Sequence, residues 1–309
     1  MEQKIAFQTF ALSKYYKEFK ALDAVDMTIY EGDIYGFVGE NGAGKTTLIR
    51  LACGLIHPTS GDYAIFGATS QDGAIREARS KTAGIVEAVA LCRTLNALDN
   101  LKLHAKLVGV TKTDEEYHQL LEEVGLDAKA IAKKKVGNFS LGMRQRLGIA
   151  LCLLSNPKFV LLDEPMNGLD PQGFIDVRET ILKLNKQGVT FLISSHILSE
   201  LDKICTRVGF LTHGRLVKEI SFEELHQLAR KKIVIRVKDS EKVSQDLVNQ
   251  FKLQEIKLDG EFISIYDTLD INEVMKYLVD KKIKIDSISS TEETIEDFYQ
   301  QLMEKGGAR

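Results

Sequence analysis

Apolar runs alternate with helix-compatible segments through the first two thirds of the chain. Three of these runs are apolar along their whole length, as in strands that are buried on both faces: 34–38, 159–162 and 190–193. Each is followed by a glycine-rich or polar turn and then by a segment that suits a helix: 45–55, 173–187 and 198–205. This alternation predicts a parallel sheet with helices on both sides.

Other parts of this region have different patterns. Segments 5–12, 24–30 and 62–66, which are bounded by turn residues, predict a small antiparallel sheet. Between residues 96 and 135 the leucines recur at three- and four-residue spacing, which predicts a helical insertion. We expect a helical subdomain over about 96–155 and a first domain that covers residues 1–222.

The last third of the chain has the order strand, helix, strand, strand, helix, strand. The expected elements are 233–237, 241–251, 253–258, 262–266, 271–281 and 283–288. This order predicts a small α+β domain of the ferredoxin-like type over residues 231–309. An amphipathic helix over 292–305 is expected to close it.

Composition excludes several classes of protein. The 309 residues carry 41 Lys and Arg against 44 Asp and Glu, a net charge of −3, so the chain is not a globally basic nucleic-acid binder. The four cysteines, Cys53, Cys92, Cys152 and Cys205, form no C-x-x-C pair, which argues against a zinc site and a thiol redox motif. We expect them to be buried thiols in a reducing compartment.

The first residues contain no apolar segment followed by a small-residue cleavage site, so we expect no secretory signal and a cytoplasmic protein. The longest apolar stretches are well short of the ~20 residues of a membrane helix. We expect no segment that crosses a bilayer.

The strongest chemical signal is a phosphate-binding loop that follows the apolar run 34–38 and precedes a helical segment. It reads Gly39, Glu40, Asn41, Gly42, Ala43, Gly44, Lys45, Thr46, Thr47 and matches G-x-x-x-x-G-K-[ST]. Glycines let backbone N–H groups turn toward phosphate oxygens, and the helix adds the positive end of its dipole. Lys45 suits the β- and γ-phosphates of ATP, and the Thr46 hydroxyl suits Mg²⁺.

A second signal is the apolar run 159–162, which ends in Asp163 and Glu164. Taken alone, acids at a strand end are often only a solvated terminus. Beside a phosphate-binding loop, Asp163 is instead expected to ligate Mg²⁺. Since successive strand residues point to opposite sides, Glu164 would face elsewhere and act as general base on water.

The order of motifs resembles the nucleotide-binding subunit of an ATP-binding cassette (ABC) transporter. After the phosphate-binding loop come FSLGMRQR from residue 139, LLDEP from 161, NGLDP from 167 and SSH from 194. The resemblance implies an α/β ABC ATPase core with antiparallel and helical subdomains, and ATP and Mg²⁺ as cofactors. It also implies two copies, or two homologous subunits, that hold two ATP molecules between them.

The resemblance assigns further roles to single residues. Tyr16 matches the aromatic residue that stacks on adenine, with Tyr15 as the competing candidate. His196 matches the switch histidine that contacts the γ-phosphate, and we include it with Glu164 among the catalytic residues.

Ser140 and Gly142 match the signature motif, which binds the γ-phosphate held by the opposite subunit. Asp170 matches the loop that crosses the dimer interface. The chain departs from the usual LSGGQ signature at Leu141 and Met143, which puts close backbone approach at Leu141 in question.

A third departure is Glu87, which stands where the family usually has a glutamine that ligates Mg²⁺. A glutamate oxygen also suits the metal. This glutamate and the FSLGMRQR signature resemble the bacitracin-export and lantibiotic-immunity branch of bacterial exporters. The function expected from this branch is export of, or immunity to, an antimicrobial peptide or other hydrophobic compound.

The expected partner is a separate integral-membrane permease, which would dock near Glu87 and residues 89–91 and hold the chain at the cytoplasmic face of the membrane. An ABC ATPase that acts on nucleic acid or ribosomes is a rival reading. Against it, the phosphate-binding loop occurs once, and Lys45 and Asp163 are too close in sequence for a long coiled coil between them. A regulatory subunit with a degenerate site is the other rival, but the expected catalytic residues are all present.

Overall fold

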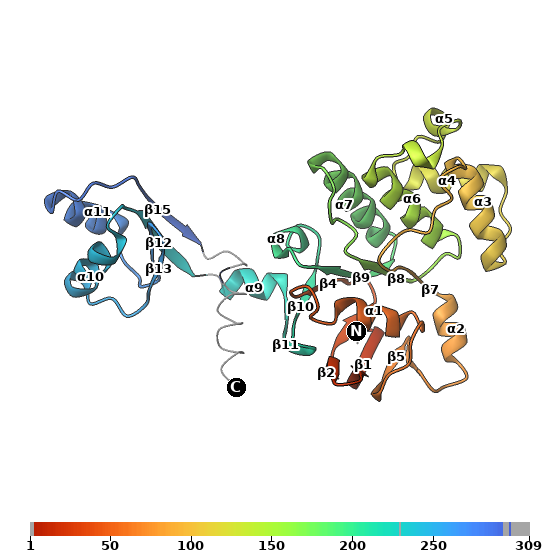
Figure 1. Ribbon diagram of the computed structural model, residues 1–309, viewed down its shortest axis with the longest axis horizontal. Helices are drawn as coiled ribbons and strands as arrows, with labels where there is room; N and C mark the ends of the chain where they lie inside the picture. Colours follow the sequence, from red (N-terminus) through yellow and green to blue (C-terminus); the bar gives the residue numbers. More distant parts are fainter. Residues whose placement is uncertain (1–2, 229, 293–296, 298–309) are drawn as a thin grey trace. The chain divides into compact units, whose positions relative to one another are not determined.

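The computed structural model describes residues 3–228, 230–292 and 297, and the chain forms two compact units, Met1–Glu223 and Glu224–Arg309 (Figure 1). Each unit has its own hydrophobic core.

The first unit contains a six-stranded sheet in the order β11-β10-β4-β9-β8-β7. Its strands are β4 (Ile34–Val38), β7 (Thr82–Ile85), β8 (Phe159–Asp163), β9 (Thr190–Ser195), β10 (Arg207–Thr212) and β11 (Arg215–Ser221). All neighbours are parallel except β10 and β11. The three apolar runs of the sequence are β4, β8 and β9, and every residue of these strands is buried, as predicted.

The helices that follow these strands are α1 (Lys45–Ala52), α7 (Pro171–Lys186) and α8 (Leu198–Leu201). Figure 1 shows α1 and α7 on opposite faces of the parallel sheet. The predicted alternation of strands and helices is therefore confirmed. Because the strands are parallel, their carboxyl ends meet at one edge, where β4, β8 and β9 lead into the loops that carry the motifs.

A second, antiparallel sheet has the order β2-β1-β5-β6, with β3 paired to β1. Its strands are β1 (Ile5–Tyr16), β2 (Phe19–Val25), β3 (Thr28–Tyr30), β5 (Ser60–Ile65) and β6 (Ala68–Thr69), and α2 (Ile75–Ser80) contacts β5 and β6. A single strand was expected over 24–30, and this prediction is wrong. The segment belongs to two strands, because β2 ends at Val25 and β3 begins at Thr28. The Phe7 ring lies between Tyr63 and Phe159, with centroids 5.9 and 6.0 Å away, and so joins the two sheets through one core.

Helical elements occupy most of residues 97–153: α3 (Ala97–Val108), α4 (Asp114–Glu123), α5 (Ala128–Ile131), η1 (Val136–Asn138) and α6 (Leu141–Leu153). Side chains cap the starts of the α-helices, because each cap accepts a hydrogen bond from a first-turn N–H. The caps are Asn96, Thr113, Asp127 and Ser140.

Helix α9 (Phe222–Leu228) is followed in the second unit by β12 (Lys231–Arg236), α10 (Ser240–Phe251), β13 (Ile256–Asp259), β14 (Phe262–Ile265), α11 (Ile271–Asp280) and β15 (Ser287–Glu292). The strands form an antiparallel sheet in the order β13-β14-β12-β15. The last strand was expected over 283–288, but pairing with β12 begins only at Ser287. Ile283 and Ile285 instead pack against the core from the preceding connection. Apart from Glu292, which ends β15, and residue 297, the helix expected over 292–305 lies outside the described residues.

The cysteines are free thiols. Cys152 and Cys205 are buried as predicted, and burial raises the pKa of Cys152 to about 12. Cys53 is half-buried, with its pKa raised to about 11 by the same cause. The expectation of a buried thiol is wrong for Cys92, which is partly exposed and whose pKa is lowered by hydrogen bonding to Thr94.

Candidate functional site

The phosphate-binding loop connects β4 to α1. Gly44, the residue before the helix, has φ +113°, and a Cβ at this position would lie 2.2 Å from the carbonyl oxygen of Ala21. Only glycine is compatible with that backbone and that contact. The first turn of α1 has no acidic residue and no side-chain cap, so its N–H groups suit an anion.

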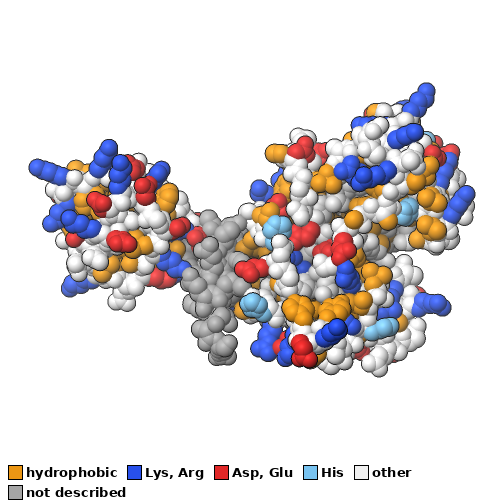
Figure 2. All heavy atoms as spheres, in the orientation of Figure 1, with side chains coloured by type: hydrophobic (Ala, Val, Ile, Leu, Met, Phe, Trp, Pro, Cys, Tyr) orange, Lys and Arg blue, Asp and Glu red, His pale blue; other side chains and the backbone are white. Residues whose placement is uncertain are grey.

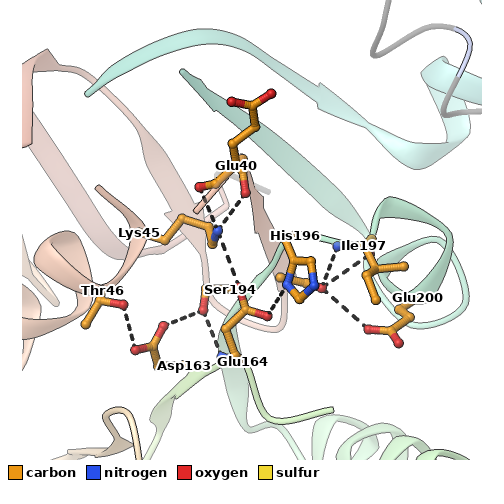
Figure 3. Close-up of polar contacts among 11 residues, drawn as sticks. Glu40, Lys45, Thr46, Asp163, Glu164, Ser194, His196, Ile197 and Glu200 are labelled. Carbon is orange, nitrogen blue, oxygen red and sulfur yellow. Dashed lines mark hydrogen bonds and ion pairs between the residues drawn. The ribbon is translucent and has the colours of Figure 1, made fainter. Parts of the chain in front are cut away.

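Lys45 crosses this loop. Its side chain is only 6% exposed, and Nζ donates to the carbonyl oxygens of Gly39 at 2.6 Å and Glu40 at 3.1 Å (Figure 3). Nζ also lies 3.4 Å from Oε1 of Glu164. A cavity of about 220 Å³ opens here, lined by Phe19, Ala21, Asn41, Gly42, Gly44, Lys45, Thr46, Thr47 and Glu164.

The two acids at the end of β8 take different partners, as Figure 3 shows. Oδ2 of Asp163 accepts a hydrogen bond from Thr46 Oγ1 at 2.8 Å. Glu164 places Oε1 toward Lys45 and Oε2 2.8 Å from Nδ1 of His196, which follows β9. Glu164 has φ +48°, a left-handed conformation that is rare for a residue with a Cβ, and this conformation turns it away from the strand.

These residues fit a magnesium nucleotide. A buried ammonium and an uncapped helix start suit phosphate oxygens. The Thr46 hydroxyl in α1 and the Asp163 carboxylate at the end of β8 are hard oxygen ligands, and they are already within hydrogen-bond distance of one another.

The structure does not bring Glu87 close to Thr46 and Asp163. Glu87 follows β7 with φ +63°, and its side chain is 63% exposed and forms an ion pair with Arg50 of α1. Among the described contacts, none joins its carboxylate to Thr46 or Asp163.

The two tyrosines at the end of β1 have different surroundings. The Tyr15 hydroxyl donates to Asp23 at 3.1 Å, and Asp23 also accepts two hydrogen bonds from Arg215. Tyr16 is 42% exposed, with the Lys14 ammonium 5.4 Å from its ring centroid. The ring of Tyr16 is therefore the more accessible one.

Phe19 was not predicted from the sequence, although it lines the cavity and is exposed. It pairs with Tyr16 across the β1–β2 turn. The sequence signal that could have identified Phe19 is its position three residues after Tyr16, in a hairpin that brings the two aromatic residues together.

Ser140, Gly142 and Asp170 form a second group. Ser140 Oγ accepts from the N–H of Met143 at 3.1 Å and caps α6, and Asp170 Oδ1 accepts from the N–H of Gly173 at 2.9 Å and caps α7. The two helix starts meet closely, because a Cβ at Gly142 would lie 3.0 Å from Cα of Gly173. No described hydrogen bond joins this group to Lys45, Thr46 or the acids of β8.

Glu200 of α8 is a further carboxylate near His196 that the sequence analysis missed (Figure 3). It accepts a hydrogen bond from Ser195 Oγ at 3.5 Å, and burial raises its pKa.

A separate groove of about 330 Å³ lies between β7, α3 and α6. Its lining is largely apolar and includes Val89, His104 and Val108. Leu103 and Leu107 of α3 are also exposed, and Figure 2 shows hydrophobic side chains on the surface over this helix. None of the helices among the described residues combines the length and the apolar composition of a membrane-spanning segment.

Comparison with known proteins identifies the family. The family model of ABC transporters matches residues 22–167. The chain is 39% identical to the bacitracin transport ATP-binding protein BcrA of Bacillus licheniformis, over 97% of both chains. It is also 39% identical to the lantibiotic transport ATP-binding protein SrtF of Streptococcus pyogenes, over 72% of this chain and 95% of SrtF.

Solved structures agree with this result. A dimeric ATP-binding cassette, MJ0796, bound to ADP and Pi, has a TM-score of 0.62 and 26% identity over 70% of this chain and 98% of its own. Another ATP-binding subunit of an ABC transporter has a TM-score of 0.61 and 28% identity over 72% and 92% of the two chains. The chain therefore belongs to the ATP-binding proteins of ABC transporters and is an ATPase of that family, as the order of its motifs predicted.

Proposed function

We propose that the chain hydrolyses ATP at the cluster formed by Lys45, Thr46, Asp163, Glu164 and His196, and that hydrolysis powers a separate membrane subunit. The observation that supports this most is the Glu164 carboxylate, whose two oxygens face Lys45 and His196 at the edge of the phosphate-binding loop. A carboxylate placed there is within reach of a water that attacks a γ-phosphate.

Each residue has a distinct role in this proposal. Lys45 exchanges its two carbonyl partners for β- and γ-phosphate oxygens when ATP binds. Thr46 and Asp163 hold Mg²⁺, which would neutralise charge that develops on the phosphates. Glu164 accepts the proton of the attacking water, and His196 orients Glu164 and contacts the γ-phosphate. Glu87 is paired with Arg50 and has no role in this cluster; it would act instead in coupling to the permease.

The loop residues 39–44 and Thr47 surround the phosphates, and Tyr16, with Phe19 beside it, stacks on adenine. The exposure of Tyr16 supports its choice over Tyr15, whose hydroxyl is bound to Asp23.

We also propose that two copies share the nucleotides. Ser140, Gly142 and Asp170 lie at two adjacent helix starts and would contact the γ-phosphate held by the second copy or by a homologous subunit. The dimeric state of the related cassette MJ0796 supports this arrangement. A charged phosphate at the start of α6 is also favourable, because no acidic residue lies in the first turn.

The groove between β7, α3 and α6 is the proposed docking site for the permease. It lies next to the segment that carries Glu87, and the exposed Val108 in its lining is preceded along α3 by the exposed Leu107. Docking there would place the chain at the cytoplasmic face of the membrane. No nucleic acid is part of this proposal.

The transported compound is proposed to be bacitracin, a lantibiotic or a similar antimicrobial peptide. The similarity to BcrA over 97% of both chains is the main support, and it includes the second unit. That unit has the element order and sheet order of a ferredoxin-like domain, and we propose it as an accessory domain.

The test is purification of the tagged chain from membranes of its native host in mild detergent. We expect a polytopic membrane protein in stoichiometric amount, and ATPase activity that bacitracin or a lantibiotic stimulates in the reconstituted pair. Val108→Asp, in the lining of the groove, should lose the membrane protein but keep basal ATPase activity, whereas Leu55→Asp, an exposed leucine that does not line the groove, should keep both. Recovery of ribosomes or nucleic acid in place of a membrane protein would contradict the proposal.

A further inference from the structure

Ser194 links the two acids of the proposed site. It lies near the end of β9, its side chain is fully buried, and it is paired in register with Asp163 of β8. Its hydroxyl donates to Oδ1 of Asp163 at 2.6 Å and accepts from the backbone N–H of Glu164 at 2.9 Å (Figure 3). One hydroxyl therefore contacts both of the neighbouring acids.

The bond to Glu164 matters because of where the strand ends. Glu164 takes φ +48°, so its backbone departs from the geometry of β8 immediately after Asp163. The left-handed region is unfavourable for a non-glycine residue, which stays there only where neighbouring groups hold it. A hydroxyl, rather than a strand carbonyl, pairs with the Glu164 N–H at this point.

The bond to Asp163 fixes a carboxylate. With Oδ1 bound by Ser194, Oδ2 is turned toward Thr46 at 2.8 Å. The group that is proposed to ligate the metal is thereby held in one rotamer, with one oxygen presented to the loop. Partners of this kind around a metal ligand affect metal affinity by about 10- to 100-fold when they are removed.

We propose that Ser194 is a positioning residue that sets the metal ligand Asp163 and the general base Glu164 relative to each other. The inference rests on the proposed function. Ser194 touches neither nucleotide nor water in this role. It acts through one side chain and one backbone N–H, and its loss would disturb metal binding and proton abstraction together.

The chain supplies a matched control one residue away. Ser195 is also buried, but successive strand residues face opposite sides, and its hydroxyl bonds to Ile197 and to Glu200 of α8. Ser195 Oγ accepts from the N–H of Ile197 at 3.0 Å and lies 3.3 Å from the Ile197 carbonyl. Neither acid of β8 is among its described partners.

The experiment compares Ser194→Ala, Ser194→Thr and Ser195→Ala in the full chain. We would measure kcat and KM for ATP, the affinity for Mn²⁺ in the presence of ADP by electron paramagnetic resonance, and the thermal midpoint. Ser194→Ala should lower kcat and the Mn²⁺ affinity by about 10-fold or more each, with KM for ATP nearly unchanged. Ser194→Thr should retain most of the wild-type kcat and most of the Mn²⁺ affinity, because threonine keeps the hydroxyl.

Ser195→Ala should retain wild-type kcat and Mn²⁺ affinity even where its thermal midpoint falls as far as that of Ser194→Ala. Equal effects of the two alanine variants, or an unchanged Mn²⁺ affinity in Ser194→Ala, would overturn the inference. Absence of ATPase activity in the wild-type chain would instead overturn the proposed function, so the two failures are distinguishable.

Discussion

His196 Nδ1 lies 2.8 Å from Oε2 of Glu164, while the other oxygen of that carboxylate lies 3.4 Å from Lys45 Nζ. Glu164 is thus held between two basic side chains. Lys45 begins α1, which follows β4, and His196 follows β9. The orientation of the carboxylate is fixed at both ends.

Glu164→Gln should bind ATP with nearly wild-type affinity but hydrolyse it at least about 100-fold more slowly, because an amide does not accept the proton of water. Without hydrolysis, ATP should hold two copies together. Steady-state ATPase assays and size-exclusion chromatography with ATP and Mg²⁺ measure both effects. Rapid turnover by this variant would remove Glu164 from the role of base.

Lys45→Ala should lose most of its ATP affinity, since it removes the buried ammonium that faces the loop. It also leaves the Glu164 carboxylate with His196 as its remaining basic partner. Isothermal titration with ATP and Mg²⁺ measures the loss, with Lys17→Ala, a substitution in the β1–β2 turn, as control. Unchanged ATP affinity would contradict the proposed phosphate site.

Gly44→Ala should destabilise the first unit by about 1 to 3 kcal/mol and abolish nucleotide binding. The added methyl group would meet the Ala21 carbonyl oxygen at 2.2 Å, in a backbone with φ +113°. Gly73→Ala is the control, because a Cβ there meets nothing within 4 Å. Chemical denaturation of both variants provides the comparison, and similar midpoints for the two would show that the loop has room for a side chain.

Glu87→Gln should change the free energy of unfolding by no more than about 1 kcal/mol, because its ion pair with Arg50 is exposed. Basal ATPase activity should change less than about twofold, since the carboxylate contacts Arg50 and not Thr46 or Asp163. The permease-stimulated activity is expected to fall, because this segment borders the proposed docking groove. Arg50→Gln should reproduce the result, and a large loss of basal activity in Glu87→Gln would favour a direct metal ligand.

Cys92 should be the thiol that reacts first with a maleimide reagent. Hydrogen bonding to Thr94 lowers its pKa, which increases the thiolate fraction at neutral pH, whereas burial raises the pKa values of the other three cysteines. Thr94→Val removes the side-chain hydrogen bond, raises the Cys92 pKa and should slow labelling at pH 7.5. Mass spectrometry of tryptic peptides identifies the labelled residue, and equal labelling of Cys53 would contradict this prediction.

Much of the site could be predicted because its key residues lie in short local motifs. Lys45 and Thr46 follow the loop glycines directly, and Asp163 and Glu164 end an apolar strand, so neighbouring positions carry the information. Strands β4, β8 and β9 were predictable for a similar reason, since complete burial leaves an unbroken apolar run.

The features that were missed depend on pairing between distant segments. Arg50 meets Glu87, and Ser194 meets Asp163, through the packing of elements that no local pattern relates. The last strand was predicted too early in the chain because Ile283 and Ile285 alternate with polar residues as in a strand. In the structure these two residues lie in the connection before β15 and pack against the core. The serine-rich segment that pairs with β12 carries little apolar signal.

The contact between Gly142 and Gly173 also limits which sequences this chain tolerates. A methyl group at Gly142 would press on the backbone of α7, and one at Gly173 would lie 2.6 Å from the Asp170 oxygen that caps that helix. A side chain at Gly142 therefore requires a shift of α7, whereas one at Gly173 requires Asp170 to leave the cap of its own helix. In a library of variants selected for transport, we expect both positions to remain glycine.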